Sequence, residues 1–351
     1  MDFIHIADVH LGLTPDATKP WSEKRAEEIW ETFKRVIIKC NEKHIDLLLI
    51  AGDLFHRQPL KKELKEVDYL FSTLKKTKVV LIAGNHDYVK NSSYYNGFVW
   101  SQNVTMLIED EIGQVYFPDI NTKVWGFSYH NYEITNPKYD DLRIEDHSCT
   151  NILLAHGGDE RHVPIDFRKL ATAGFDYVAL GHIHKPDLKM QECIAYAGSL
   201  EPTDKNDVGV HGFVMGQISQ GITQFKFVPF ACREYVSLRI KLTPATVTGA
   251  LVDRVTEAIN TYGREHIYKI YLEGSYDPDV PIDHKRLELA GNISEIKDES
   301  VPEYNIELLK QEHKDDVVGM YIQSFLSEPL TECRKKALYY GIHAMLSQLN
   351  K

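Results

Sequence analysis

The sequence of 351 residues predicts an α/β sandwich, with two central sheets flanked by helices, followed by a small α+β domain and C-terminal helices. Short apolar runs alternate with amphipathic helical stripes in its first half. Continuous apolar runs of about four to six residues are typical of strands buried on both faces, as in a sheet covered by helices. Alternation of such strands with helices favours parallel neighbouring strands.

Five apolar runs within residues 1–184 end in polar residues. They occupy residues 3–7, 47–51, 79–83, 152–155 and 177–180. Between the first three lie two helical stripes, from Ile29 to Cys40 after a predicted cap at Ser22, and from Leu60 to Leu74. Ligands gather at the carboxyl ends of the strands in sheets of this kind, so the polar ends of the runs mark the expected site.

The rest of the chain changes pattern twice. Residues 194–230 are strand-like and punctuated by glycine, which predicts a second sheet that completes the sandwich. A new unit begins near Tyr235, so we expect one domain over 1–235, a small α+β domain over 236–310 and a helical segment over 311–351. Two apolar stripes predict amphipathic helices in that last segment: Val317, Val318, Ile322, Phe325 and Leu326, then Leu338, Ile342, Met345, Leu346 and Leu349.

Composition is that of a soluble globular protein, with 43% apolar and 26% charged residues. The longest apolar run falls far short of the roughly 20 residues that span a bilayer. Residues 1–4 lack a basic stretch followed by an apolar run, so we expect no signal peptide and no membrane anchor. Five cysteines without a C-x-x-C pair predict reduced thiols in a cytoplasmic protein and argue against a cysteine zinc site.

The formal net charge of −11 opposes a nucleic-acid function, because duplex binding depends on cationic contacts to phosphate. The charge is unevenly distributed. Residues 273–316 hold 13 acidic and 5 basic side chains, a local net charge of −8. The other 307 residues therefore carry only −3.

The polar ends of the runs share carboxylate, amide or imidazole groups. They are Asp8, His10, Asp53, Asn85, His86, Asp87, His156, His182 and His184. Hard divalent ions prefer carboxylate and amide oxygen, and imidazole adds affinity for manganese, iron or zinc. Asp8 and His10, like His182 and His184, are separated by one residue, and such pairs point the same way in an extended chain. Asp53 could bridge two ions, and two ions roughly 3.5–4 Å apart clamp the oxygens of a phosphoryl displacement.

The alternative interpretation treats each of these residues singly, as a surface or core histidine or a helix cap. It fits the histidines that stand alone, which are His44, His147, His162, His211, His266, His284, His313 and His343. His5 and His130 are predicted to lie in strands. It does not fit the full set, because five separate strand ends would each need a ligand-type residue by accident.

The motif series D-x-H, G-D-L-F-H, G-N-H-D, H-G and G-H-I-H, in that order over residues 1–184, resembles the calcineurin-like metallophosphoesterases. Three segments resemble, within that family, the SbcD-type DNA repair exonucleases and their shorter YhaO-like relatives. They are G-D-L-F-H at residues 52–56, the run at 175–184, and Y-A-G-S-L-E at 196–201, where the family has Y-P-G-S. The resemblance implies a two-sheet sandwich with a cap domain after Tyr235.

The resemblance also implies a role for each site residue. Asp8, His10, Asp53 and His184 would hold one ion, and Asp53, Asn85, His156 and His182 the other. His86 would stabilise the phosphate or protonate the leaving oxygen, and Asp87 would orient its imidazole. His56 would help to place the substrate phosphate; the alternative is that it is a surface loop histidine.

The leading hypothesis is a nuclease subunit that uses two divalent ions, expected to be Mn²⁺ with Mg²⁺, Fe²⁺ or Zn²⁺ as alternatives. It would act on DNA ends or single strands in a repair complex with an SMC-like coiled-coil ATPase. One alternative is a phosphodiesterase of small molecules such as cyclic nucleotides, and another is a non-catalytic DNA-tethering subunit. The sequence leaves homodimer formation open.

Overall fold

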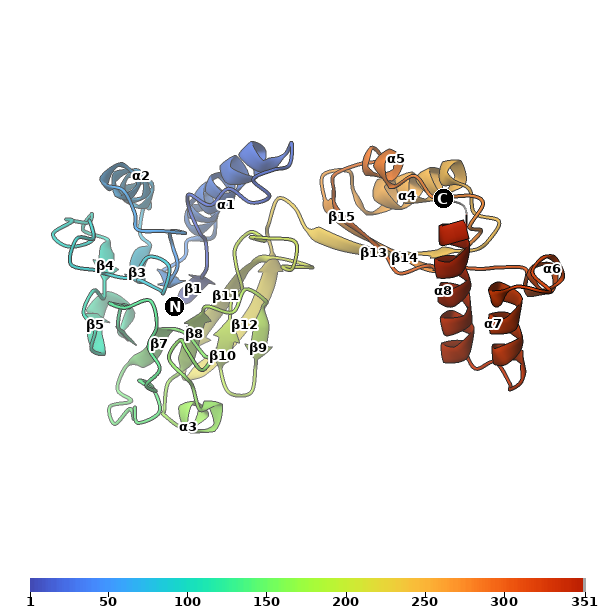
Figure 1. Cartoon of the computed structure of the whole chain (residues 1–351). Coiled ribbons are helices and arrows are strands. Elements are labelled where there is room, and N and C mark those ends of the chain that lie inside the picture. Colours follow the sequence, from blue (N-terminus) through green and yellow to red (C-terminus); the bar gives the residue numbers. More distant parts are fainter. Residues whose placement is uncertain (350–351) are drawn as a thin grey trace. The chain divides into compact units, whose positions relative to one another are not determined.

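The computed structural model describes residues 1–349 and divides the chain into two compact units, Met1–Glu234 and Tyr235–Lys351. Figure 1 shows the helices and strands of each unit. Residues 350 and 351 and the side chain of Leu349, the last of its predicted stripe, lie outside the described residues. No helix in the described part of the chain is long and apolar enough to cross a membrane.

The first sheet of the first unit has the strand order β12-β11-β1-β2-β3-β4. The strands β1 (Asp2–Ile6), β2 (Leu47–Ala51), β3 (Lys78–Ile82) and β4 (Val104–Met106) are parallel. At the other edge, β11 (Gly212–Ser219) pairs antiparallel with β1, and β12 (Ile222–Pro229) pairs antiparallel with β11.

The second sheet has the order β5-β6-β7-β8-β10-β9. Its strands are β5 (Gly113–Phe117), β6 (Thr122–Gly126), β7 (Thr150–His156), β8 (Tyr177–Gly181), β9 (Asp187–Lys189) and β10 (Ile194–Tyr196). The inner four, β6, β7, β8 and β10, are parallel. The short 3₁₀ helix η1 (Pro118–Ile120) joins β5 to β6.

The sequence predicts that residues 194–230 form the second sheet, but they do not. Only β10 joins it, while β11 and β12 extend the first sheet because β11 pairs with β1, with Phe3 opposite Gly216. The second sheet is built mainly from residues 113–181.

Burial on both faces explains the continuous apolar runs. Leu47, Leu49 and Ala51 of β2 pack in one cluster with Ile152 and Leu154 of β7, so the two sheets face each other. Leu48 and Ile50 point the other way, into a cluster with α1 (Ser22–Lys43) and α2 (Lys61–Ser72). The outer face of the second sheet packs against α3 (Phe167–Ala171) and the aromatic residues of its loops. The sandwich predicted from the sequence is confirmed.

The start of α1 differs in one detail from the prediction. Ser22 is the first helical residue and not the cap, and the helix has no side-chain capping hydrogen bond from its cap residue. The chain enters the helix through a turn in which the Ser22 amide donates to the carbonyl of Lys19 (3.1 Å). Trp21 occupies the cap position, and its indole donates to Asp16.

The second unit begins with a parallel sheet covered by helices on one face. Its strands β13 (Tyr235–Leu242), β14 (Ile267–Tyr276) and β15 (Ile293–Asp298) lie side by side, and β16 (Val301–Pro302) extends the pairing along β14. Apolar residues of α4 (Thr248–Tyr262) and α5 (His284–Glu288) pack on this sheet.

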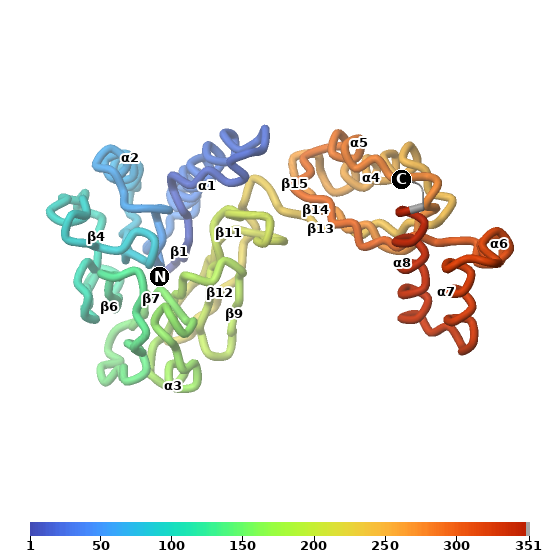
Figure 2. Tube along the Cα trace, in the orientation of Figure 1, coloured from blue at the N-terminus to red at the C-terminus, as the bar shows by residue number. Residues whose placement is uncertain are grey.

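Three helices complete the second unit, where the sequence predicted two. They are α6 (Ile306–Glu312), α7 (Val317–Leu326) and α8 (Glu332–Leu349), which follow one another in the trace of Figure 2. Val318 and Ile322 of α7 pack against Leu338 and Ile342 of α8, and all four are fully buried.

Candidate metal centre

The polar residues predicted to bind metal lie in loops just after strands of both sheets. Asp8 and His10 follow β1, Asp53 follows β2, and Asn85 follows β3. His156 ends β7, while His182 and His184 follow β8. Five of the seven are almost fully buried: Asp8, His10, Asp53, Asn85 and His156. The sandwich therefore brings side chains from five separate strand ends into one interior.

The backbone at four of these positions is left-handed, not extended. The φ angles are 49° at Asp8, 52° at His10, 49° at Asp53 and 95° at His182. These residues therefore lack the extended backbone that the sequence predicts, in which residues i and i+2 point the same way. Tertiary hydrogen bonds hold the loops instead: the Asp8 amide donates to Gly52, and the His10 amide to Asp53. Non-glycine residues in this region are uncommon and cluster at functional sites.

One group of side chains centres on two facing imidazoles. His10 Nε2 lies 3.1 Å from His184 Nε2 and 4.0 Å from Asp53 Oδ2. Asp8 joins His10 and His184 in a set whose ligand atoms all lie within 4.8 Å of one another. These are three of the four residues that the family resemblance implies for one ion, the fourth being Asp53.

A second group surrounds the amide oxygen of Asn85. His156 Nε2 lies 2.9 Å from Asn85 Oδ1, and His182 Nδ1 lies 3.1 Å from the same oxygen. Asp53 Oδ2 is 3.6 Å from His156 Nε2. Because the same oxygen of Asp53 lies near both groups, Asp53 stands between them, where a bridging ligand would have to be.

In three of the site histidines, the outer ring nitrogen, which faces away from the site, binds an oxygen acceptor. This contact orients the inner ring nitrogen towards the site. His156 Nδ1 lies 2.8 Å from the carbonyl of Ala51, His182 Nε2 lies 2.7 Å from Asp159, and His184 Nδ1 lies 3.0 Å from Asp207. A carbonyl or carboxylate oxygen only accepts, so the proton sits on the outer nitrogen. The inner nitrogens of His156 and His182 then turn lone pairs towards Asn85 Oδ1, another acceptor. Converging lone pairs of this kind fit a cation.

The electrostatics of the buried carboxylates agree with this. Burial, with Asp53 nearby, raises the pKa of Asp8 to about 8, and burial also raises the pKa of Asp53. Within residues 1–349 neither carboxylate forms an ion pair with a lysine or arginine. Burial lowers the pKa of His184, but Asp207 and Asp8 outweigh it and raise that pKa to about 9. Carboxylate, imidazole and amide oxygen together suit a divalent ion such as manganese, iron or zinc.

Glycine is required beside these ligands because the chains approach closely. A Cβ atom on Gly84 would lie 2.3 Å from Asp53 Oδ1 and 2.7 Å from His156 Nε2. Gly198, with a φ of +76°, would place a Cβ 2.7 Å from the His184 carbonyl. Both glycines belong to motifs that the sequence singled out.

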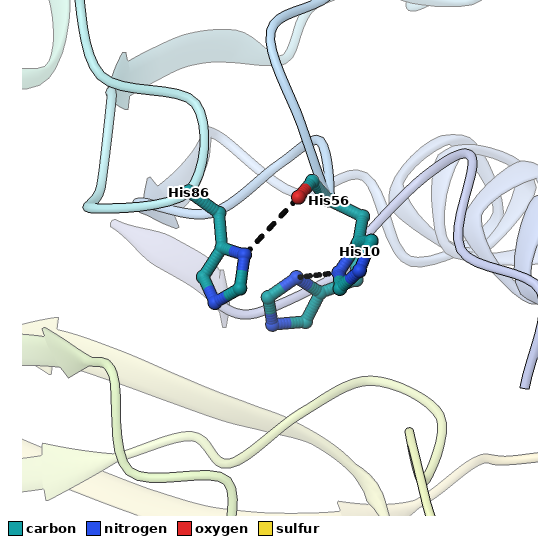
Figure 3. Close-up of side chains that lie close together, drawn as sticks. All are labelled: His10, His56 and His86. Carbon is teal, nitrogen blue, oxygen red and sulfur yellow. Dashed lines mark hydrogen bonds between the residues drawn. The ribbon is translucent and has the colours of Figure 1, made fainter. Parts of the chain in front are cut away.

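His86 and His56 lie beside His10, as Figure 3 shows. The His86 amide donates to Asp53 Oδ1 (2.8 Å), and His86 Nδ1 lies 3.1 Å from the carbonyl of His56. The imidazoles of His56 and His86 stack with centroids 5.0 Å apart. His10, His56 and His86 have ring nitrogens within 4.8 Å of one another, so His86 is close enough to be a ligand itself.

Asp87 has different partners from those we predicted. One oxygen accepts from the Gly84 amide (2.8 Å), and the other accepts from the Phe55 amide (3.2 Å) and the Tyr95 hydroxyl (2.8 Å). The His86 imidazole is oriented by the His56 carbonyl instead. Asp87 thus holds together the loops that carry Asp53 and Asn85.

The sequence missed residues that contact the site histidines. His162, which we took to stand alone, lies 3.0 Å from Asp159, and Asp159 bonds to His182. Asp159 comes three residues after His156 in an H-G-G-D segment, so an acidic residue beside a predicted ligand was the available signal. Asp207 lies 23 residues beyond the His184 that it contacts, and no local pattern marks it.

Two other histidines also differ from their predicted surroundings. His211, also taken to stand alone, lies 2.8 Å from the Ser199 hydroxyl. His130 lies in the loop after β6, not in a strand, with Nε2 2.8 Å from the Ile108 carbonyl. His5 does lie in β1, where Nδ1 is 3.0 Å from the hydroxyl of Tyr177.

A two-sheet sandwich with carboxylates, an amide and histidines at its strand ends defines a metal-dependent phosphoesterase. The chain belongs to the calcineurin-like phosphoesterase family, whose sequence profile matches residues 1–186. It is therefore a hydrolase of phosphate esters, in a family that uses a dinuclear metal site.

Three relatives show where the chain falls within the family. It is 28% identical over 261 residues to the DNA double-strand break repair protein Mre11 of Methanocaldococcus jannaschii, covering 69% of this chain and 70% of that protein. It is 29% identical over 233 residues to Mre11 of Archaeoglobus fulgidus, covering 58% of this chain and 51% of that protein. It is 24% identical over 250 residues to the uncharacterized metallophosphoesterase YhaO of Bacillus subtilis, covering 65% of this chain and 60% of that protein.

Proposed function

We propose that this protein is a DNA nuclease that uses two divalent ions, with Mn²⁺ as the working metal. The position of Asp53 carries the proposal: its Oδ2 lies 4.0 Å from His10 and 3.6 Å from His156, between two ligand groups. The similarity to two Mre11 proteins named for double-strand break repair supports DNA as the substrate.

Each site residue receives a role in this proposal. Asp53 would bridge the two ions. Asp8, His10 and His184 complete one site, and Asn85, His156 and His182 complete the other. Two bound ions supply Lewis-acid stabilisation of an in-line phosphoryl displacement. Asp207 and Asp159 hold His184 and His182 in the orientation that binding requires.

His86 is the proposed acid, supported by its proton arrangement. Its Nδ1–H donates to the His56 carbonyl, which leaves Nε2 as the ring nitrogen that would carry a proton to the leaving oxygen. The amide of His86 binds Asp53 Oδ1, which ties the position of the acid to the bridging carboxylate. His56 stacks on His86 and is proposed to contact the substrate phosphate.

The second unit carries cations on its sheet despite its acidic sequence. The face of the sheet opposite α4 and α5 carries four basic and two acidic side chains: Arg239, Lys241, Lys269, Lys297, Glu273 and Glu295. Arg239 pairs with Glu273, and the buried Lys269 pairs with Glu295, which leaves an excess of positive charge on this face. Arg239 and Lys297 lie over the ring of Tyr271, at 4.7 and 5.7 Å from its centroid. Cations on a sheet face are suited to contact phosphate. We propose that this face of the cap domain, residues 236–310, contacts DNA.

The partner that we propose is an SMC-like coiled-coil ATPase bound through the C-terminal helices. Val317 and Met320 of α7 are 63% and 70% exposed, although the neighbouring Val318 is fully buried. Exposed apolar residues at i and i+3 of a helix are suited to bind a partner helix.

A substrate comparison tests the proposed function. The purified protein would be incubated with Mn²⁺ and with labelled duplex DNA, single-stranded DNA and bis(p-nitrophenyl) phosphate, with EDTA and the Asp53→Asn variant as controls. We expect metal-dependent cleavage of DNA. Hydrolysis of the small phosphodiester alone would favour the small-molecule phosphodiesterase, and DNA binding without any hydrolysis would favour the tethering subunit.

A further inference from the structure

An exposed tyrosine lies at the rim of the metal centre. Tyr132 is in the loop between β6 and β7, and half of its surface (50%) is exposed. Its ring centroid is 6.3 Å from that of His86 and 5.8 Å from that of His162, edge to face in both cases. The ring of Tyr132 therefore lies between His86, the proposed acid, and His162, which adjoins Asp159 and His182.

The loop that carries Tyr132 is fixed on both sides. Before it, the Tyr129 amide donates to the Ala83 carbonyl (3.1 Å) and His130 bonds to the Ile108 carbonyl. After it, the Ile134 amide donates to the Arg161 carbonyl (2.9 Å), and the Val163 amide donates to the Ile134 carbonyl (2.7 Å). The backbone that carries the aromatic ring is thus held in place on both sides.

Internal packing does not account for this residue. The other aromatic residues near it in this loop, Tyr129 and Tyr139, are fully buried and direct their hydroxyls at the His156 carbonyl. Tyr132 has no hydrogen-bond partner for its hydroxyl within residues 1–349, and it belongs to no buried apolar cluster. A fixed, half-exposed aromatic ring is suited to bind a flat ligand.

We propose that Tyr132 is a stacking platform for a nucleobase adjoining the phosphate that is cleaved. This rests on the proposed nuclease function and deepens it. Base stacking on an aromatic side chain tolerates every sequence, because each base has a π face. A base inside a duplex is already stacked on its neighbours, so the platform serves single strands and frayed ends.

The test compares oligo(dT) with an oligomer of equal length in which every residue is abasic. Wild-type protein with Mn²⁺ should show a KM for the abasic oligomer that is higher by roughly 5- to 150-fold, the range expected from loss of base stacking. Tyr132→Ala should raise the KM for oligo(dT) by a similar factor, with little change in kcat, and should lose the preference for oligo(dT) over the abasic oligomer.

Two control variants separate stacking from folding. Tyr132→Phe keeps the ring and should behave as wild type. Tyr69→Ala removes a tyrosine that is 68% exposed on α2, away from these histidines, and should also behave as wild type. If Tyr132→Ala lowers the melting temperature, equal KM values of the wild-type protein for the two oligomers would still overturn the stacking role.

Failure of this inference differs from failure of the proposed function. Wild-type protein that cleaves oligo(dT) and the abasic oligomer with equal KM, or a Tyr132→Ala variant with unchanged KM, would overturn the stacking role alone. Wild-type protein that cleaves no DNA at all would overturn both.

Discussion

Asp53 is the residue whose substitution should disturb the metal centre most widely. Its Oδ2 lies within 4.0 Å of His10 and His156, while its Oδ1 accepts from the His86 amide. Asp53→Asn removes the negative charge between the two ligand groups, so both ions should be lost or bound more weakly. Asp8→Asn should mainly affect one ion. Metal content by elemental analysis measures this, and retention of two ions by Asp53→Asn would show that another group bridges.

Substitution of His86 tests whether catalysis can be lost while both metal ions are retained. If it is the acid, His86→Ala should keep both ions and lose about 10²- to 10⁴-fold in turnover, the usual contribution of general acid catalysis. Its nitrogens also lie within ligating distance of His10 and His56, so metal content must be measured alongside the rate. Lost metal would identify His86 as a ligand, and an undiminished rate would transfer the acid role to His56. His147→Ala, in an exposed loop, is a matched control.

The phosphate contact proposed for the second unit lies on one face of its sheet, within an acidic region of the sequence. Strand alternation places Arg239, Tyr271 and Lys297 in one row across the three strands, since Arg239 pairs with Tyr271 and Tyr271 with Lys297. Leu238, Ile240 and Leu272 face the helices on the other side. The net charge of a segment is therefore a poorer guide to phosphate binding than the charge of the sheet face that would contact the phosphate.

A pair of substitutions on that face tests its contact with DNA. Arg239→Gln with Lys297→Gln should weaken duplex binding and reduce the slope of log affinity against log salt by about 2, because each phosphate contact contributes about 0.9. Hydrolysis of bis(p-nitrophenyl) phosphate should be unchanged. Lys285→Gln with Arg286→Gln, on the exposed surface of α5 across the sheet, is the matched control. An unchanged salt slope would exclude this face from the DNA interface.

At the scale of the whole molecule, the net charge of −11 opposes binding to DNA phosphates. A partner that supplies DNA affinity would offset this repulsion. Deleting the last helix is a poor test of that partner, because Leu338 and Ile342 are fully buried against α7 and their removal would expose Val318 and Ile322. Substitution of exposed residues avoids this loss of core.

Val317→Asp with Met320→Asp should therefore abolish co-purification with a coiled-coil ATPase and leave phosphodiester hydrolysis nearly intact. Both side chains are mostly exposed, so the cost to folding should be small. Leu289→Asp changes an 85% exposed leucine after α5 and serves as the control. Full ATPase binding by the double variant would place the interface on another surface.

The amino-acid sequence by itself determined the α/β class, the family and the five strands that precede the polar residues of the candidate site. Apolar runs such as residues 47–51 report burial on both faces, and the residue that follows a buried strand lies at a sheet end, so both are local properties of the chain. The motif series led to the family for the same reason, since each motif is a short segment with its own chemistry.

Only the tertiary structure decided which residues meet across long separations. It divided the strand ends between two sheets, placed β11 beside β1, and brought Asp207 to His184. It also gave Asp8 and His10 left-handed backbones and turned Asp87 towards Phe55 and Tyr95. These choices depend on packing and on hydrogen bonds between segments distant in the chain, and the order of residues within one segment carries no information about them.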